Sequence, residues 1–194
     1  MIPPYFLSVE HLKFQGRYGK EKGNRICAIL GLISGWGFFL SWIGIWVAPQ
    51  PRIILPILGS PSIVLPAINL RIPLLHLIVS IFFLMPGAWF GVNGVRGTTL
   101  RVAETHRTEK VVTGGIYSIV RHPQYLGGLL AHVGISFLLS ALYSLLFTPL
   151  IMILIVLISM KEERELIREF RLEYEEYRKR VPMLIPGLRR HWQD

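Results

Sequence analysis

Long uncharged apolar runs alternate along this chain with short segments that carry almost all of its charge. Residues 26–48, 72–95 and 126–159 contain no Asp, Glu, Lys or Arg. The first two runs have 23 and 24 residues, and a helix needs about 20 to cross a hydrocarbon core about 30 Å thick. The third has 34 residues, which is too long for one crossing and just long enough for two short ones. We therefore expect membrane helices over the first two runs and a helical hairpin over the third.

The turn of this hairpin is expected near residues 140–149, where polar side chains and Pro149 interrupt the apolar run. A hairpin returns the chain to the side of the membrane that it left. His122 before the hairpin and the Lys161-Glu162-Glu163 segment after it should therefore lie at the same membrane face.

One further apolar stretch, residues 53–68, has only 16 residues and contains Pro56, Pro61 and Pro66. Proline interrupts a helix because it lacks an N–H and clashes with the preceding turn. The stretch is expected to be either a short, kinked crossing or a re-entrant segment, and the sequence leaves both possibilities open.

Three segments with an excess of Lys and Arg flank the apolar runs, namely residues 1–25, 96–121 and 161–190. The first is expected to be a solvated or interfacial tail. Within the third, residues 161–180 predict an amphipathic helix that lies against the membrane core. All three segments share one side of the membrane if residues 53–68 do not cross, which is the arrangement that the positive-inside rule favours.

The composition supports a membrane protein, because 52% of the 194 residues are hydrophobic and only 17% are charged, against about a quarter in soluble domains. We expect an all-α, polytopic integral membrane protein. It would have about five membrane helices, one of them short and broken by proline, and a C-terminal amphipathic helix. Residues 1–100 would form the N-terminal tail and membrane helices, and residues 101–194 a C-terminal catalytic region.

The net charge of +9 is gathered between the apolar runs, which favours anionic lipid headgroups over nucleic acid as its partner. Cys27 is the only cysteine, so neither a disulfide framework nor a cysteine metal site is expected. The six histidines are scattered. His122 and His132 share an expected helix, but their spacing places them about 80° out of line and about 15 Å apart. We therefore expect no metal and no nucleic acid.

The densest polar chemistry lies in residues 114–128, which read Gly-Gly-Ile-Tyr-Ser-Ile-Val-Arg-His-Pro-Gln-Tyr-Leu-Gly-Gly. Pro123 disfavours helical backbone at His122, so a helix is expected to begin at Pro123 with His122 at its mouth. The first N–H groups of such a helix have no partners within it. With Arg121 and His122 beside them, they are suited to a carboxylate or another polar ligand group.

The sequence thus predicts a site with two walls, one mainly cationic from residues 110–126 and one anionic from Glu162, Glu163 and the helix after them. A ligand with both a carboxylate and a positive centre would be complementary to this site. A nucleoside would also fit, because its ring can stack on Tyr117 or Tyr125 and its hydroxyls suit a carboxylate. S-adenosylmethionine combines all these groups and is the cofactor that we expect.

The order of these residues resembles the catalytic C-terminal half of the isoprenylcysteine carboxyl methyltransferase family. The resemblance covers about residues 108–187. It rests on the run from Thr113 to Gly127, on Glu162-Glu163, and on Phe170, Tyr174, Tyr177 and Val181-Pro182. The chain departs from the family at Arg171, where relatives often have glycine, and at residues 158–161, where many carry an arginine.

This resemblance implies a multi-pass membrane enzyme that uses S-adenosylmethionine to methylate the carboxylate of a prenylated cysteine or a lipid-like substrate. It implies cofactor binding by Lys110, Val111, Val112, Gly115, Tyr117, His122, Tyr125, Leu126, Glu162 and Glu163. An ionised carboxylate needs a cation to hold it rather than a general base, and Arg121, Arg180 or Lys161 would serve. We therefore expect Arg121, Arg180 and Glu163 to act in catalysis.

Other functions remain open at this point. The shorter pattern Arg-His-Pro-x-Tyr-x-Gly is also found in phospholipid N-methyltransferases and in membrane sterol reductases. A methyltransferase for a phospholipid or another lipid amine must remove a proton from the acceptor, and Glu162 or Glu163 would accept it. A reductase would instead use NADPH, and a non-catalytic membrane scaffold would use neither.

Overall fold

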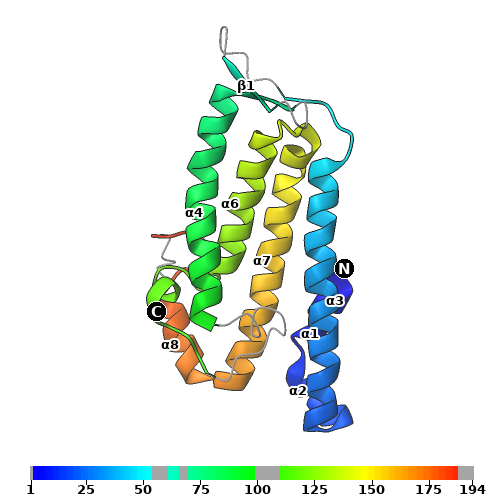
Figure 1. The fold of residues 1–194 in the computed structure, drawn as a ribbon. Helices are drawn as coiled ribbons and strands as arrows, with labels where there is room; N and C mark the ends of the chain where they lie inside the picture. Colours follow the sequence, from blue (N-terminus) through cyan, green and yellow to red (C-terminus); the bar gives the residue numbers. More distant parts are fainter. Residues whose placement is uncertain (1, 54–60, 66–69, 99–109, 188–194) are drawn as a thin grey trace.

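Four long helices run side by side in the computed structural model, which describes residues 2–53, 61–65, 70–98 and 110–187 (Figure 1). They are α3 (Lys20–Val47), α4 (Leu74–Thr98), α6 (Pro123–Leu138) and α7 (Leu142–Phe170). Helices α3, α4 and α7 are each long and apolar enough to cross a membrane, and the 16 residues of α6 span about 24 Å. The expected all-α integral membrane architecture is confirmed, whereas the number of complete crossings stays a prediction.

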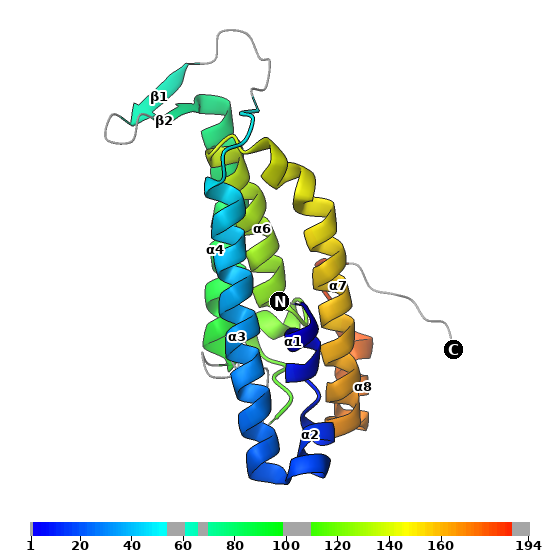
Figure 2. The ribbon, with the colours of Figure 1, turned by 90° about the vertical axis from the view of Figure 1, so that its right-hand side faces the viewer.

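Shorter elements gather at the two ends of this bundle. Towards the lower end in Figure 1 lie α1 (Ile2–Ser8), α2 (His11–Tyr18), the 3-10 helix η2 (Gly115–Ser118) and α8 (Leu172–Arg180). At the opposite end, β1 (Ser62–Leu65) and β2 (Leu70–Pro73) form an antiparallel pair with Ser62 opposite Pro73. Figure 2 shows α1 between α3 and α7.

The expectation of a kinked crossing or re-entrant segment at residues 53–68 is corrected for the part that the structure describes. There, residues 62–65 form the strand β1 instead of a helix. Pro61 and Pro66 border this strand and would interrupt a helix, while the β-branched residues Ile63 and Val64 favour a strand. The rest of the stretch, apart from Ile53 and Pro61, lies outside the described residues.

The predicted hairpin in residues 126–159 is present, with α6 ending at Leu138 and α7 beginning at Leu142. The turn comes at the start of the expected range, and Pro149 lies inside α7. Helix α7 then continues beyond the apolar run to Phe170, so the expected amphipathic helix of residues 161–180 is divided between α7 and α8. The division falls at Arg171, whose φ of 46° departs from helical backbone.

Helices α4 and α6 are in backbone contact at glycine. A Cβ atom placed on Gly127 would lie 2.5 Å from the backbone nitrogen of Gly91 and 2.8 Å from the carbonyl oxygen of Gly87. A side chain at residue 127 would therefore force the two helices apart. This contact fixes the start of α6, and with it His122, against the lower half of α4.

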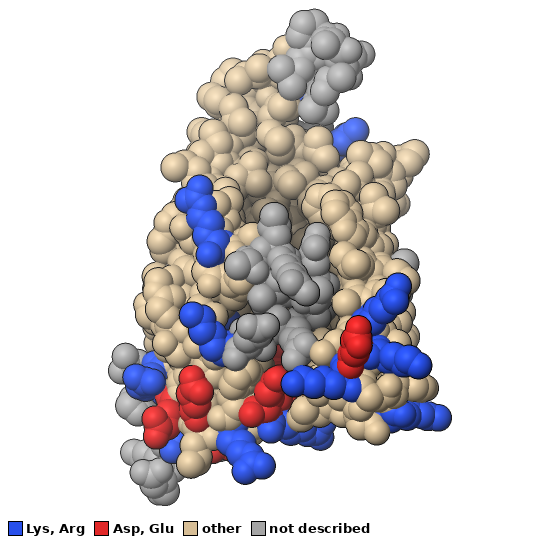
Figure 3. Space-filling model, turned by 60° about the horizontal axis from the view of Figure 1, so that its bottom comes forward, with Lys and Arg blue, Asp and Glu red and all other residues tan. Residues whose placement is uncertain are grey.

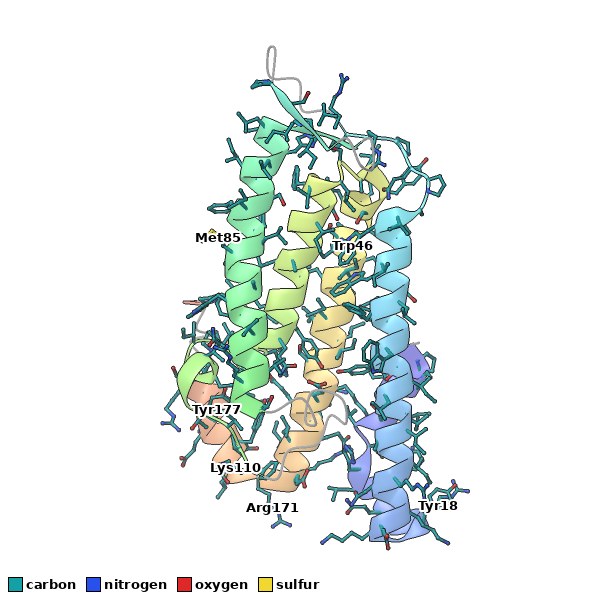
Figure 4. The ribbon with its side chains drawn as sticks, in the orientation of Figure 1. Tyr18, Trp46, Met85, Lys110, Arg171 and Tyr177 are labelled. Atoms are coloured by element: carbon teal, nitrogen blue, oxygen red, sulfur yellow. The ribbon has the colours of Figure 1, made fainter. Side chains whose placement is uncertain are left out.

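The upper half of the bundle is joined through aromatic rings. Trp46 points from α3 into the bundle (Figure 4), and its indole Nε1–H donates to Nδ1 of His132 on α6 at 3.3 Å. The Nε2 atom of His132 lies 3.1 Å from the carbonyl oxygen of Ser144. Trp42 of α3 also stacks on the imidazole of His132. The two ring centroids are 5.6 Å apart, and the ring planes are inclined by 10°. The buried imidazole thus connects α3, α6 and α7.

Charged side chains gather at the lower end of the bundle, where Figure 3 shows Lys and Arg beside Glu. The N-terminal helices, the segment from Lys110 to Arg121 and the end of α7 with α8 all meet there. The three basic segments of the sequence thus share one end as far as the structure describes them, which is the arrangement that the positive-inside rule favours.

Candidate active site

The site is built around the mouth of α6, which begins at Pro123 with His122 as its N-cap. This is the helix start that the sequence predicts. The backbone N–H groups of Arg121 and His122 donate to the carbonyl oxygens of Pro182 and Met183 at 2.9 and 3.1 Å. The segment that follows α8 therefore lies against the Arg-His-Pro motif and brings α8 to the site.

Arg121 and Glu163 form a buried ion pair. Both Nη2 and Nε of the guanidinium approach the same carboxylate oxygen, Oε1, at 2.7 and 2.8 Å. The Nη1 group of Arg121 donates to the carbonyl oxygens of Arg178, at 3.0 Å, and Val181. One arginine thus joins the motif to α7 and to the end of α8.

His122 lies between two glutamates. Its Nε2 atom is 3.2 Å from Oε1 of Glu163, and its Nδ1 atom is 3.5 Å from Oε2 of Glu162. Burial lowers the pKa of His122, but the hydrogen bonds to Glu162 and Glu163 outweigh burial, so that the pKa lies above its ordinary value. The imidazole stacks on the ring of Tyr125, with the ring centroids 5.5 Å apart and the ring planes inclined by 12°. This contact fixes the plane of the imidazole.

Glu162 accepts hydrogen bonds from two phenols on its Oε1 atom. One comes from Tyr125 on α6, and the other comes from Tyr5 on α1 at 2.6 Å. The two hydroxyls also lie within hydrogen-bonding distance of each other. This carboxylate is therefore held both from α6 and from the N-terminal segment, and the sequence did not indicate the contact from the N-terminal segment.

Two further tyrosines tie the motif to its neighbours. The hydroxyl of Tyr117 donates to the carbonyl oxygen of Gly94 on α4 at 3.1 Å and accepts from Nε2 of Gln124 at 3.2 Å. The hydroxyl of Tyr177 on α8 donates to the carbonyl oxygen of Tyr117 at 2.6 Å. Burial raises the pKa of both phenols, so both remain protonated donors at neutral pH.

A cavity of about 450 Å³ opens beside these side chains. Its polar part is lined by Thr98, Arg121, His122, Gln124, Tyr125 and Glu162. Its apolar part is lined by Phe38, Phe39 and Trp42 of α3, with Ile155 of α7 opposite. The cavity therefore joins a charged end at the mouth of α6 to an apolar end among the membrane helices.

The sequence of this region matches a known protein family. Residues 72–173, more than half of the chain, match the phospholipid methyltransferase family. The chain belongs to this family. The match includes the Arg-His-Pro motif and the Glu162-Glu163 pair.

Among curated relatives, methanethiol S-methyltransferase 2 of Bradyrhizobium diazoefficiens is 43% identical over 75 residues, 38% of this chain and 27% of that protein. Methanethiol S-methyltransferase of Pseudomonas deceptionensis is 36% identical over 81 residues, 39% of this chain and 28% of that protein. Protein-S-isoprenylcysteine O-methyltransferase of Schizosaccharomyces pombe is 36% identical over 85 residues, 43% of this chain and 36% of that protein.

The matched part of this chain spans well under half the length of each of these relatives. No solved structure matches the chain. The resemblance to membrane methyltransferases of the isoprenylcysteine type is confirmed, and the chain is that of an integral membrane protein.

The structure brings most of the predicted site residues to one place. Among the predicted residues, those that line the cavity are Val111, Val112, Tyr117, Arg121, His122, Tyr125 and Glu162. Glu163 lies outside the lining, buried between Arg121 and His122. The two predicted walls therefore meet. Glu163 does not line the cavity, but it contacts Arg121 and His122, which do.

The other predicted residues lie outside the cavity lining. Lys110 is exposed at the base of the bundle (Figure 4), and Gly115 is exposed with a φ of 61°. Leu126 packs in an apolar cluster around Phe90. Arg180 is exposed on α8, where its Nε–H donates to the carbonyl oxygen of Glu176 at 3.3 Å.

Sequence reasoning missed the contribution of the N-terminal segment, since Tyr5, Val9 and His11 also line the cavity. The mixed, basic composition of residues 1–25 predicts only a solvated or interfacial tail. The available signal was the apolar triplet of residues 5–7 within a basic segment.

Proposed function

We propose that the cavity binds S-adenosylmethionine and that the enzyme methylates an acceptor with an apolar part that lies in the bilayer. The observation that carries this proposal is the junction of two environments in one cavity. Glu162, His122 and Tyr125 lie at its charged end, and the aromatic side chains of α3 lie at its apolar end.

The residues at the charged end fit this cofactor. A volume of about 450 Å³ lies within the range of about 300–1,000 Å³ that is usual for ligand cavities. Glu162 can accept hydrogen bonds from ribose hydroxyls or from an ammonium group, and the tyrosine rings can stack on a base. The first N–H groups of α6 are suited to a carboxylate.

S-adenosylmethionine would supply an electrophilic methyl group in this cavity. Glu162 and Tyr125 would bind and orient it, and His122 would fix the direction of the Glu162 carboxylate through its Nδ1 atom. The Arg121–Glu163 pair would hold the backbone of the motif and the imidazole in place. Because these side chains are almost fully buried, they would also keep water away from the reacting groups.

The apolar end indicates how an acceptor would enter. Gly35, Phe38, Phe39 and Trp42 line the cavity at the i, i+3, i+4 and i+7 positions of one face of α3. Phe39 is 49% exposed within the apolar run of α3, so this face extends from the cavity to the outside of the bundle. An acceptor with a hydrocarbon tail could therefore enter from the membrane with its polar end directed towards His122.

Two acceptors are candidates. The order of the motif favours the carboxylate of a prenylated cysteine, which is also the substrate class named for the relative from Schizosaccharomyces pombe. An apolar or small thiol is the second candidate, in line with the relatives that are named methanethiol S-methyltransferases.

The ion pairs of the site favour the thiol. Each cation that was expected to hold an acceptor carboxylate already has a partner among the described residues. Arg121 is paired with Glu163, Lys161 lies 2.7 Å from Glu10, and Arg180 bonds to a carbonyl oxygen on the exposed face of α8. A thiol would need no such cation, but it must lose its proton before it can act as a nucleophile. Glu162, a carboxylate in the cavity lining beside His122, would accept this proton.

The proposal is tested by calorimetric titration of the detergent-purified protein with S-adenosylhomocysteine and, separately, with NADPH. We expect the first to bind and the second not to bind. Binding of NADPH alone would indicate a reductase instead, and binding of neither would indicate a scaffold. Transfer of a radiolabelled methyl group to a prenylated cysteine, an alkyl thiol and a lipid amine then identifies the acceptor.

A further inference from the structure

The N-terminal segment contributes a side chain to the centre of the candidate site. Tyr5 of α1 is 9% exposed, and its hydroxyl donates to Oε1 of Glu162 at 2.6 Å. Burial raises the pKa of this phenol, so it remains a hydrogen-bond donor at neutral pH. Its ring packs with Val9 and with Ile158 of α7.

A second contact binds the same segment to the neighbouring residue of α7. The Nζ atom of Lys161 lies 2.7 Å from Oε1 of Glu10. Hydrogen bonds from Lys13 and Lys161 lower the pKa of Glu10, so this ion pair is formed at neutral pH. Two consecutive residues of α7, Lys161 and Glu162, are therefore held by residues from the N-terminal segment.

The segment is itself held on α3. A Cβ atom placed on Gly23 of α3 would lie 2.6 Å from the backbone nitrogen of Gln15 on α2, so the two backbones are in direct contact. The side chains of Gln15 and Asn24 share a hydrogen bond of 2.7 Å. Tyr5 thus approaches Glu162 from a support separate from α6, which carries the other phenol, Tyr125.

We propose that the N-terminal segment forms a third wall of the active site and that Tyr5 is a positioning residue in it, which acts through Glu162. Its hydroxyl and that of Tyr125 lie side by side on Oε1 of Glu162, which leaves Oε2 directed towards His122 and the cavity. The carboxylate is then oriented for a hydroxyl or ammonium group of the ligand. This inference rests on the proposed function, because it assigns Tyr5 to the binding of the same cofactor.

The experiment compares Tyr5→Phe with the wild-type protein, both as full chains purified in the same detergent. This substitution removes only the hydroxyl and keeps the ring that packs on Val9 and Ile158. We expect the Kd for S-adenosylhomocysteine to rise about tenfold, as for the loss of one hydrogen bond to a charged group. In turnover, KM for the cofactor should rise by a similar factor while kcat stays within about twofold.

Tyr18→Phe is the matched control. Tyr18 lies on α2 of the same segment, is 46% exposed, and stacks on Phe14 away from the cavity. Its Kd for S-adenosylhomocysteine should equal that of the wild type. A Kd for Tyr5→Phe that also equals the wild-type value would overturn the proposal, even if the variant unfolds at a lower temperature.

Glu162→Gln separates failure of this inference from failure of the proposed function. If the wild type does not bind S-adenosylhomocysteine, the proposed function fails. If it binds, and Glu162→Gln loses binding while Tyr5→Phe does not, only the role of Tyr5 is wrong.

A double-mutant cycle with Tyr125→Phe provides the second test. Because both phenols hold one carboxylate, we expect the losses of the two single variants not to multiply in the double variant. A strictly multiplicative loss would overturn the shared role.

Discussion

The guanidinium of Arg121 and the carboxylate of Glu163 meet with two nitrogens on one oxygen, and neither side chain is more than 7% exposed. The same oxygen is 3.2 Å from Nε2 of His122. A single carboxylate oxygen therefore serves the two consecutive cationic residues of the motif. Because a buried charge without its partner is costly, this oxygen is a determinant of stability as well as of the geometry of the site.

Replacement of Glu163 by Gln tests this relationship. The substitution keeps the size of the side chain but leaves Arg121 buried without a counter-charge. Removal of one partner from a buried ion pair typically costs about 3–5 kcal/mol, and we expect a loss at the lower end because Arg121 keeps its bonds to two carbonyl oxygens. Denaturant unfolding in detergent, followed by circular dichroism, measures the loss.

Glu176→Gln is the control for this measurement. Glu176 is exposed on α8, so the same chemical change should alter the free energy of unfolding by less than about 0.5 kcal/mol. Equal effects of the two substitutions would show that the Arg121–Glu163 pair does not stabilise the fold.

The raised pKa of His122 predicts a pH dependence of stability. A group whose folded-state pKa is raised stabilises the fold fully below its unfolded pKa, about 6.5 for histidine, and loses this contribution as the pH rises through the folded-state value. We therefore expect the free energy of unfolding to decline from this cause as the pH rises above about 6.5. The decline should be smaller in His122→Gln, measured over the same pH series, and an unchanged decline would contradict the assignment.

Trp42 is expected to set the depth of the apolar end of the cavity. Its ring lies over Gly128, where an added Cβ would be 3.2 Å from the indole, and its Nε1 has no hydrogen-bond partner among the described residues. Trp42→Leu should deepen the cavity and shift preference towards longer acceptors. Each additional buried methylene is worth about 0.8 kcal/mol, or about fourfold in kcat/KM.

A series of acceptors with increasing chain length measures this preference. Trp36→Leu provides the control, because Trp36 is 57% exposed on the same helix and does not line the cavity. If both variants show the wild-type preference, Trp42 does not limit the length of the acceptor.

Arg171→Gly is expected to stabilise the protein. Arg171 joins α7 to α8 with φ 46° and ψ −120°, a conformation that costs a residue with a side chain about 1–3 kcal/mol and that glycine adopts readily. Its side chain is exposed and lies at the base of the bundle (Figure 4). We expect a gain of about 1 kcal/mol in the free energy of unfolding, the lower end of this range.

Glu173→Gly distinguishes relief of strain from a general effect of glycine in this region. Glu173 is exposed in the first turn of α8, where glycine should cost up to about 1 kcal/mol. A loss of stability in Arg171→Gly as well would contradict the interpretation.

The periodicity and length of the apolar runs were sufficient to predict the long helices and the hairpin between α6 and α7. The helix start at Pro123 was also predictable, because the covalent geometry of proline acts locally. From these two features it followed that His122 and the Glu162-Glu163 pair would meet at one end of the bundle, as they do.

Other features depend on tertiary contacts that have no local signature. Nothing in residues 1–25 shows that Tyr5 would reach Glu162, because its partner lies 157 residues away. The break at Arg171 was equally hidden, since arginine is a good helix former. The β1 strand was misjudged because an apolar stretch rich in proline was weighed only as a membrane segment.

The hydrogen bonds of His132 bear on whether methyl transfer is coupled to a proton gradient across the membrane. The indole of Trp46 can only donate, so Nδ1 of His132 is the acceptor, and the ring hydrogen must be on Nε2, where it is donated to Ser144. Both nitrogens are committed, and this imidazole is held as a neutral tautomer in the middle of the bundle. Its one ring proton is already donated to the carbonyl oxygen of Ser144, so neither nitrogen is free to relay a proton. We therefore expect methyl transfer in sealed vesicles to proceed at the same rate whether or not a proton gradient is imposed across the membrane.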